Sequence, residues 1–184
     1  MPTLETARLR LRPLSMEDLD WFAALRGDAD VMRYIGTEGP LTHEQSKQKL
    51  DKHLKCWADN GLGMFGVRRD DDAEPVGWGG LQPLEQTAEI EVGYALGKAA
   101  WGRGFATEAA RAVIEWGFHV RALDRIVAVA TPENEASRRV MVKLGMHYEG
   151  IKSRYGHDCA YYSLTPESFA LRKHSRDVGP ALAR

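Results

Sequence analysis

The chain has 184 residues, of which 43% are hydrophobic and 28% are charged, and its formal net charge at pH 7 is −1. This composition is typical of one globular domain, and the balanced charge excludes a general electrostatic attraction to nucleic acid or to a membrane surface. No apolar run reaches the length of a membrane span and no signal-peptide pattern opens the sequence, so we expect a cytoplasmic protein. In that reducing compartment, a disulfide between Cys56 and Cys159 is not expected.

The first third of the chain predicts one strand followed by helices. Leucine alternates with arginine over 8–12, which predicts a strand with one buried face. Capping residues and apolar spacing then predict helices over 16–26, 29–35 and 43–60. The two early helices and the loop from Gly36 to Leu41 are expected to form one wall of a cleft. The aromatic residues there are expected to be core or rim residues: Trp21, Tyr34 and Trp57.

Three strands are predicted next, over 64–69, 76–81 and 87–96. Short polar turns join them, so they should form an antiparallel meander. The acidic run over 70–75 is interpreted as a solvated hairpin tip rather than a metal site, because no second group of ligands supports a metal.

The segment from Ile90 to Phe118 joins a strand, a glycine turn and an amphipathic helix. Gly102 and Gly104 come directly before the helix, where glycine lets backbone N–H groups approach a ligand and the helix dipole adds a partial positive charge. The pattern predicts a phosphate or pyrophosphate site. Three interpretations stay open at this point: an empty tight turn, a dinucleotide-binding turn, and a coenzyme A pyrophosphate site.

The last third predicts a buried strand over 125–130, a short helix capped by Asn134, and a hairpin from 148 to 165. The strands before and after the central helix should be parallel and joined by a right-handed crossover. The element order therefore predicts a mixed sheet with helices on its faces. It weakens the dinucleotide interpretation, because the glycine turn lies mid-chain and Thr107 replaces the third glycine. Glu133 would be the only carboxylate available to bind a ribose.

The element order, the turn over 101–109 and the later Asn134-x-x-Ser137 pattern resemble the GNAT superfamily of acyl-CoA N-acyltransferases. Residues 4–14 and 28–35 resemble its RimJ/RimL-like branch, which includes acetyltransferases of ribosomal-protein N-terminal amines. The resemblance implies an α/β (α+β) fold in a single domain, with a mixed, mostly antiparallel sheet of about seven strands and helices on both faces. This GNAT-like domain should cover 1–166, followed by a short, partly mobile C-terminal extension over 167–184.

The resemblance also implies acetyl-CoA as cosubstrate and assigns its contacts residue by residue. The family's phosphate-binding pattern falls on 101–106, where Trp101 departs from the usual glutamine or arginine. This departure matters little if main-chain N–H groups bind the phosphates. The implied cofactor-binding residues are Tyr94, Ala95, Leu96, Gly102, Arg103, Gly104, Phe105, Ala106, Thr107, Asn134 and Ser137.

Two residues are candidate catalytic groups. Ser137 matches a serine near the thioester that is suggested to protonate the leaving thiol. The alternative, which the sequence supports equally, is that Ser137 is only a small polar residue in the first turn of a helix. Some members carry a tyrosine donor where this chain has Met141, and others a glutamate base where it has Val129. We therefore take Glu91 as the candidate general base, acting directly or through a water, with a solvated strand carboxylate as the alternative.

These observations predict an N-acetyltransferase that moves an acetyl group from acetyl-CoA to a primary amine by direct attack in a ternary complex. The acceptor stays open among a protein N-terminal α-amine, a polyamine, an aminoglycoside and a small metabolite, and acidic residues in the cleft would favour a cationic one. The lack of an obvious base favours an amine of low pKa. A CoA-binding sensor or scaffold is the alternative, and an NAD-binding oxidoreductase is a third. No metal, nucleic acid or membrane partner is expected, and the protein should be a monomer or homodimer.

Overall fold

The structure, a computed structural model, describes residues 2–36, 38–69, 74–85 and 87–177. Within these ranges, eight strands form one sheet in the order β1-β2-β3-β4-β5-β6-β8-β7, and only β5 and β6 are parallel neighbours. The strands are β1 Leu4–Glu5, β2 Leu9–Pro13, β3 Met64–Arg69, β4 Gly77–Pro83, β5 Ile90–Leu96, β6 Ile126–Ala130, β7 His147–Arg154 and β8 His157–Leu164.

The sheet is the mixed, mostly antiparallel one that the sequence predicts, and the unexpected strand is the two-residue β1, which pairs with β2. The predicted turn over 70–75 can be followed only in part, because 70–73 lie outside the described residues. The helices are α1 Leu19–Gly27, α2 Ala29–Met32, α3 His43–Asn60, α4 Phe105–His119, α5 Glu135–Leu144 and α6 Pro166–Asp177.

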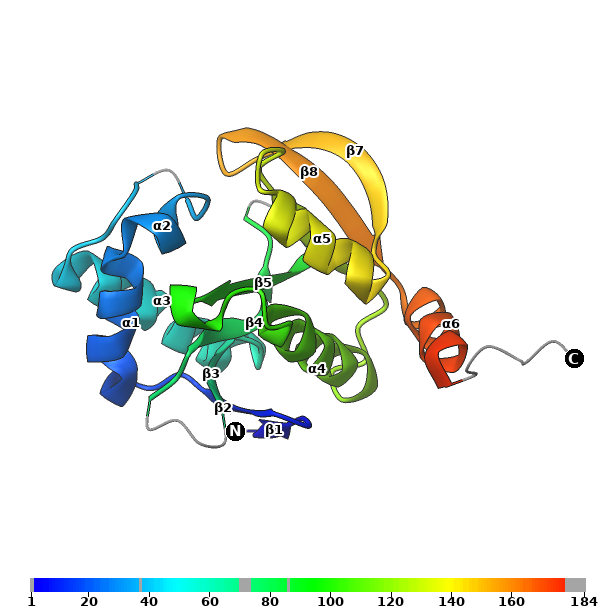
Figure 1. Cartoon of the computed structure of the whole chain (residues 1–184), viewed down its shortest axis with the longest axis horizontal. Coiled ribbons are helices and arrows are strands. Elements are labelled where there is room, and N and C mark those ends of the chain that lie inside the picture. Colours follow the sequence, from blue (N-terminus) through cyan, green and yellow to red (C-terminus); the bar gives the residue numbers. More distant parts are fainter. Residues whose placement is uncertain (1, 37, 70–73, 86, 178–184) are drawn as a thin grey trace, which may run out of the picture.

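Helices cover both faces of the sheet, as predicted (Figure 1). Helices α1, α2 and α3 pack on one face, whereas α4 and α5 pack on the other. The first face is buried by Leu14, Phe22, Val31, Leu50, Met64, Trp78 and Ala95. The second face is buried mainly by Phe65, Val67, Leu81 and Val92 against Ala109, Ala110, Val113, Ile114, Met141 and Leu144. Trp57, at the end of α3, is also a core residue, only 7% exposed.

Local sequence sets where the functional helices begin and end. Thr42 and Gln45 form the predicted capping box of α3, and Gly61 closes that helix with φ 61°. The side chain of Asn134 accepts a hydrogen bond in the first turn of α5, and Gly145 ends α5 with φ 91°. Helix α2 is shorter than predicted and stops at Met32. The following residues up to 35 are consequently free to line the cavities described below.

The sheet opens in its middle, between β5 and β6. Within the described residues their parallel ladder consists of the pair Glu91–Val127, whereas β4 pairs with β5 along the whole of β5. Beyond Glu91, the main-chain N–H and C=O groups of β5 that point toward β6 therefore have no ladder pairing with that strand in the described part of the chain. The end of β5, from Tyr94 to Leu96, still pairs with β4, but it also lines a cavity together with residues of α5.

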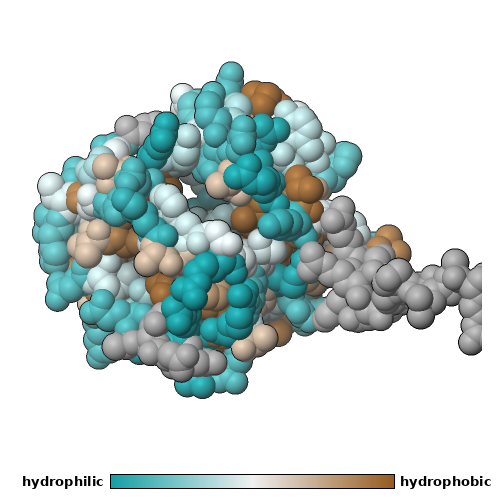
Figure 2. Space-filling model, in the orientation of Figure 1, coloured by the Kyte–Doolittle hydropathy of each residue, from teal (hydrophilic) through white to brown (hydrophobic). Residues whose placement is uncertain are grey.

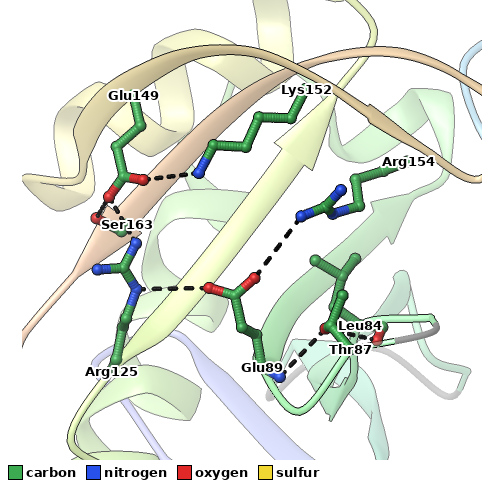
Figure 3. Close-up of polar contacts among 8 residues, drawn as sticks. All are labelled: Leu84, Thr87, Glu89, Arg125, Glu149, Lys152, Arg154 and Ser163. Carbon is green, nitrogen blue, oxygen red and sulfur yellow. Dashed lines mark hydrogen bonds and ion pairs between the residues drawn. The ribbon is translucent and has the colours of Figure 1, made fainter.

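A polar network fastens the β7–β8 hairpin to the turn before β5 (Figure 3). Glu149 accepts hydrogen bonds from Ser163, Arg125 and Lys152, and Arg125 also lies 3.6 Å from Glu89. Arg154, at the end of β7, approaches the second oxygen of Glu89 to 4.0 Å. The network links three parts of the chain and holds the hairpin beside the opening of the sheet.

The final described helix, α6, was not expected from the sequence. Its Phe169 is buried and packs edge-on against Phe118 of α4, with ring centroids 5.6 Å apart. The segment 167–184 therefore begins as an ordered helix, and residues 178–184 lie outside the described residues. The predicted mobility of the tail stays a prediction. No helix among the described residues is long and apolar enough to cross a membrane.

Candidate active site

Two cavities meet at the opening of the sheet. The first, here called the glycine-turn cavity, has a volume of about 440 Å³ and lies between the end of β5, the turn before α4 and α5. The second, the Glu91 cavity, has about 420 Å³ and lies between β4, β5, α1, α3 and the β7–β8 hairpin. Figure 2 shows the molecular surface hollowed between the α1–α3 side and the hairpin side. Both cavities are lined by Tyr34, Ile35, Tyr94, Asn134 and Ser137.

The glycine turn has the backbone geometry of an anion-binding site. Gly102 and Gly104 have φ of 71° and 81°, a region that favours glycine, and Gly104 is the N-cap of the 15-residue helix α4. The N–H groups that open α4 have no partner within the helix, and the helix dipole makes this end partly positive. The turn can therefore hold a phosphate or pyrophosphate through its main chain.

Side chains around the turn fix its position. The Arg8 guanidinium donates to the Arg103 carbonyl at 3.1 Å and pairs with Glu108 in the first turn of α4 at 2.5 Å. Trp101 donates its indole N–H to the Leu96 carbonyl at 2.6 Å, which ties the turn to the end of β5. Trp101, which stands where the family pattern has glutamine or arginine, thus connects the turn to β5 in this chain.

The predicted cofactor residues converge on one cavity. With the exception of Arg103, all of them line the glycine-turn cavity: Tyr94, Ala95, Leu96, Gly102, Gly104, Phe105, Ala106, Thr107, Asn134 and Ser137. The Arg103 side chain instead lies over the Phe105 ring, 5.2 Å from its centroid. Three basic side chains that the sequence analysis did not single out also line this cavity: Arg33, Arg139 and Lys143.

Two hydroxyl groups lie where the cavities meet. Tyr94 Oη is 3.0 Å from Ser137 Oγ and also donates to the Ser137 carbonyl at 3.2 Å. The backbone N–H of Ser137 donates to the Asn134 side chain, so the cap of α5 positions this serine. Burial raises the pKa of Tyr94, which keeps its hydroxyl protonated. The pair offers a proton donor at the junction even though Met141 stands where some members of the family carry a tyrosine donor.

Glu91 is a buried carboxylate, only 5% exposed, so its interpretation as a solvated strand residue is wrong. Its Oε1 accepts hydrogen bonds from Gln82, its cross-strand neighbour, and from Tyr155. Burial raises the pKa of Glu91, and these two donors oppose that rise. A carboxylate with a raised pKa that lines a cavity is suited to accept a proton.

Tyr155 reaches Glu91 from the hairpin through an unusual backbone conformation. Its φ is 53°, and the next residue, Gly156, has φ 79°, as in a two-residue turn of type I′. Side-chain-bearing residues other than asparagine and aspartate rarely adopt this conformation. The backbone of Tyr155 is therefore locally strained, and this conformation places its phenol within hydrogen-bond distance of Glu91.

The helical wall of the Glu91 cavity was predicted in outline but not by residue. Tyr34 lines it as a rim aromatic, and Trp78 of β4 faces it from the sheet. Sequence reasoning missed the polar residues that helices α1 and α3 contribute: Arg26, Lys49, Lys52 and His53. Burial and the Arg26 charge lower the pKa of His53 to about 3, so this imidazole is neutral near pH 7.

Both cysteines are free, as expected. Within the described residues, no three His, Cys, Asp or Glu side chains gather as a metal site requires. The absence of a metal from the reaction stays a prediction.

Comparison with known proteins decides the family. The family model described as "Acetyltransferase (GNAT) domain" matches residues 8–147. The chain belongs to the GNAT acetyltransferase family. It is 33% identical to the "Uncharacterized N-acetyltransferase YoaA" of Bacillus subtilis over 84% of this chain and 88% of the relative. It is 30% identical to the spermidine N(1)-acetyltransferase of Escherichia coli over 77% and 74% of the two chains.

A solved structure has the same fold. The GNAT-family acetyltransferase from Bacillus anthracis superposes with a TM-score of 0.77 and 28% identity, over 90% of this chain and 99% of that one. The protein is thus an acyl-CoA-dependent N-acetyltransferase of the GNAT type, as the sequence predicts. GNAT acetyltransferases use acetyl-CoA as cosubstrate and an amine as acceptor.

Proposed function

We propose that this GNAT enzyme acetylates a primary amine by direct attack on acetyl-CoA, with the thioester at the junction of the two cavities. The observation that carries the proposal is that both cavities are lined by Tyr94 and Ser137. A donor in the glycine-turn cavity and an acceptor in the Glu91 cavity would meet there, so no covalent acetyl-enzyme is required. Such positioning of two reactants is itself a large source of rate acceleration.

The donor would be held by the chain's own main chain and basic side chains. The N–H groups from Gly102 to Thr107 bind the pyrophosphate, and Arg33, Arg139 and Lys143 lie on the same cavity for further phosphate contacts. The pantetheine arm follows the end of β5 from Leu96 toward Tyr94, where the missing β6 partner leaves main-chain groups available. One such N–H group stabilises the thioester oxygen as negative charge develops on it.

The reaction needs one proton removed and one supplied. The neutral amine attacks the thioester carbonyl, the new C–N bond forms and the C–S bond breaks. Glu91 accepts the proton that the amine loses, directly or through a water, and the hydroxyl pair of Ser137 and Tyr94 gives a proton to the departing thiolate. Because a thiol has a pKa near ~8.5, a weak acid such as this pair suffices.

The acceptor is proposed to be a primary amine of low pKa. The resemblance of residues 4–14 and 28–35 to the RimJ/RimL-like branch supports a protein N-terminal α-amine. An α-amine, with a pKa of about 7.7–8.0, is neutral far more often at pH 7 than a lysine side chain. Monomer or homodimer and a cytoplasmic location stay predictions from the sequence.

A CoA-binding sensor with little turnover is the second candidate. It is favoured by Val129 and the buried Met141, which stand where other members carry a base and an acid. The Tyr94–Ser137 pair and Glu91 compensate for both replacements in our proposal.

Calorimetric titration with acetyl-CoA, CoA and NAD tests the donor site. We expect micromolar affinity for acetyl-CoA, on the order of −8 kcal/mol. Gly104→Glu should abolish it, since the new carboxylate would occupy the phosphate position. Gly150→Glu, at another glycine of positive φ outside both cavities, is the matched control and should bind normally. NAD binding without acetyl-CoA binding would overturn the proposal, and acetyl-CoA binding without CoA release in the presence of amines would favour the sensor.

A further inference from the structure

One wall of the Glu91 cavity carries a buried cation. Arg26, in the last turn of α1, is only 7% exposed, and its guanidinium lies 5.0 Å from the Phe22 ring centroid and 5.4 Å from that of Trp78. Its Nε is buried and has no hydrogen-bond partner among the described residues. Burial lowers the pKa of Arg26 to about 10, so the group remains charged at neutral pH while it is poorly solvated. A desolvated arginine stabilised by aromatic faces is a strong binding group for a carboxylate or phosphate.

A second unpartnered group lies in the same aromatic cluster. The His53 ring is 6.0 Å from Phe22 and 6.0 Å from Trp78, and its buried Nε2 also has no hydrogen-bond partner among the described residues. Arg26 and His53 both line the Glu91 cavity. Buried polar atoms are nearly always hydrogen-bonded in proteins, so two orphaned donors or acceptors on one cavity wall indicate a site for a polar ligand.

The charges around Arg26 leave this wall net positive. Lys49 and Lys52 line the same cavity. The charges of Lys49, Lys52 and Arg26 each lower the pKa of the nearby Glu38 carboxylate. Glu38 lies 2.8 Å from Lys49 and does not line the cavity itself. Glu38 forms an ion pair with Lys49, whereas Lys52 and Arg26 act on it only through their charges. Glu91 of β5 and Glu85, just after β4, also line the cavity, so its cations come from helices α1 and α3 and its carboxylates come from the sheet.

We propose that the acceptor is a primary amine that also carries an anionic group, with the amine at Glu91 and the anion at Arg26. This inference rests on the proposed function and narrows its acceptor. A cavity lined by carboxylates alone would favour a polyamine, whereas here a second ammonium group would meet Arg26, Lys49 and Lys52. Like charges in a poorly solvated site repel strongly, so the same residues select against diamines.

The two ends of the cavity are close enough for one small molecule. Trp78, under the Arg26 guanidinium, pairs with Ala95 of β5, and Glu91 lies four residues earlier on the same strand. Four residues of a strand span about 13 Å. An N-terminal α-amine followed by an acidic side chain carries both groups and has the low pKa proposed above. A free ω-amino carboxylate or amino phosphate carries the same two groups on one small molecule and is the simpler probe. These sources share the same chemistry.

Binding and turnover should be measured separately on the full-length protein. Calorimetry of the CoA-saturated enzyme compares an ω-amino carboxylate, the α,ω-diamine of equal chain length and the simple alkylamine, and CoA release reports acetylation of the same compounds. We expect the amino carboxylate to bind at least about tenfold more tightly than the alkylamine, and the diamine to bind more weakly than either. A short peptide amide with glutamate at its second position, compared with its lysine counterpart, identifies a peptide source.

Variants assign the preference to the basic wall. Arg26→Met should raise the KM for the anionic acceptor and so remove the preference for it. Lys52→Glu should weaken the same preference, and because Lys52 is exposed this variant leaves the buried residues unchanged. Arg10→Met, an exposed arginine outside both cavities, is the matched control. The inference is supported if the anionic acceptor binds more tightly than the alkylamine and both variants weaken this preference. This holds for either source of the acceptor, and also if the CoA-release assay shows no turnover. Equal or tighter binding of the diamine, or an anion preference unchanged in Lys52→Glu and Arg26→Met, overturns it while leaving acetyl transfer to amines intact.

Discussion

Tyr94 Oη lies 3.0 Å from Ser137 Oγ, and these two hydroxyl groups stand where the glycine-turn cavity and the Glu91 cavity meet. The tyrosine comes from β5 and the serine from the first turn of α5, so the pair bridges the opening of the sheet. A proton donor at this junction is available from the strand, although α5 carries Met141 where some relatives place a tyrosine.

Removal of either hydroxyl should slow the reaction without preventing binding. We expect Ser137→Ala and Tyr94→Phe each to lower kcat by about tenfold to a hundredfold, at or below the low end of general acid catalysis because a thiol is a good leaving group. Steady-state kinetics with acetyl-CoA and a reactive amine measure this. The double variant should be little worse than the poorer single variant, since the two groups act as one unit. Tyr148→Phe, at an exposed tyrosine of β7, should be silent, and additive losses would argue against a shared role.

The hairpin tyrosine should control the pH dependence of the reaction. Tyr155 donates a hydrogen bond to Glu91 that favours the ionised carboxylate, so it works against the rise in pKa that burial causes. Tyr155→Phe should therefore raise the pKa of Glu91 further and move the acidic limb of the kcat/KM profile to higher pH. Tyr155 is a positioning residue here, and a purely structural role would lower the rate without moving this limb.

Glu91→Gln should remove the acidic limb itself and lower kcat/KM at neutral pH by about a hundredfold or more, the usual range for a general base. The amide keeps the shape and one hydrogen-bond acceptor but cannot take a proton. A variant that keeps both its rate and the wild-type pH profile would show that another group, or solvent, deprotonates the amine.

Asn134 should have two separable roles. Its side-chain oxygen accepts from the Ser137 N–H as the cap of α5, which leaves its amide N–H groups for the cosubstrate. Asn134→Ala should lose about 1 kcal/mol of unfolding free energy, while Asn134→Asp keeps the cap and should unfold like the wild type. Both should raise the KM for acetyl-CoA. Denaturant unfolding and kinetics on the same preparations separate the roles, and a normal KM in the aspartate variant would exclude the cosubstrate contact.

The parts of the site that depend on local pattern could be predicted from the sequence. Two glycines before an amphipathic helix, and an asparagine at a helix start, act through backbone conformation within a few residues. The structure accordingly places the glycine turn and Asn134 on one cavity. Their roles in binding and catalysis stay predictions.

The parts that depend on distant contacts could not be predicted. Tyr155 meets Glu91 across 64 positions of sequence, through a hairpin turn that carries a tyrosine in a rare conformation. Gln82 meets Glu91 because of the strand register, which no single strand specifies. Arg26 resembles any basic residue in a last helical turn until its packing on Phe22 and Trp78 is known.

The network around Glu149 should make the fold sensitive to acid. Hydrogen bonds from Ser163, Lys152 and Arg125 lower the pKa of Glu149 to about 2, from an ordinary value of 4.5. A carboxylate whose pKa is lower in the folded protein than in the unfolded chain stabilises the fold fully above the unfolded value and loses that contribution as the pH falls. The loss attributable to Glu149 should therefore occur between about pH 4.5 and pH 2.

Glu149→Gln tests this contribution directly. The side chain is 24% exposed, so solvent screening reduces the effect, and we expect a loss of roughly 1–2 kcal/mol at pH 7. The difference from the wild type should shrink as both are titrated to pH 2 in urea unfolding experiments, because the wild-type carboxylate is then increasingly protonated. Glu133→Gln, at an exposed position before α5, is the control and should not change stability. A stability difference that stays constant with pH would mean that the glutamine disturbs packing, and that the charge of Glu149 is not what holds the hairpin to Arg125.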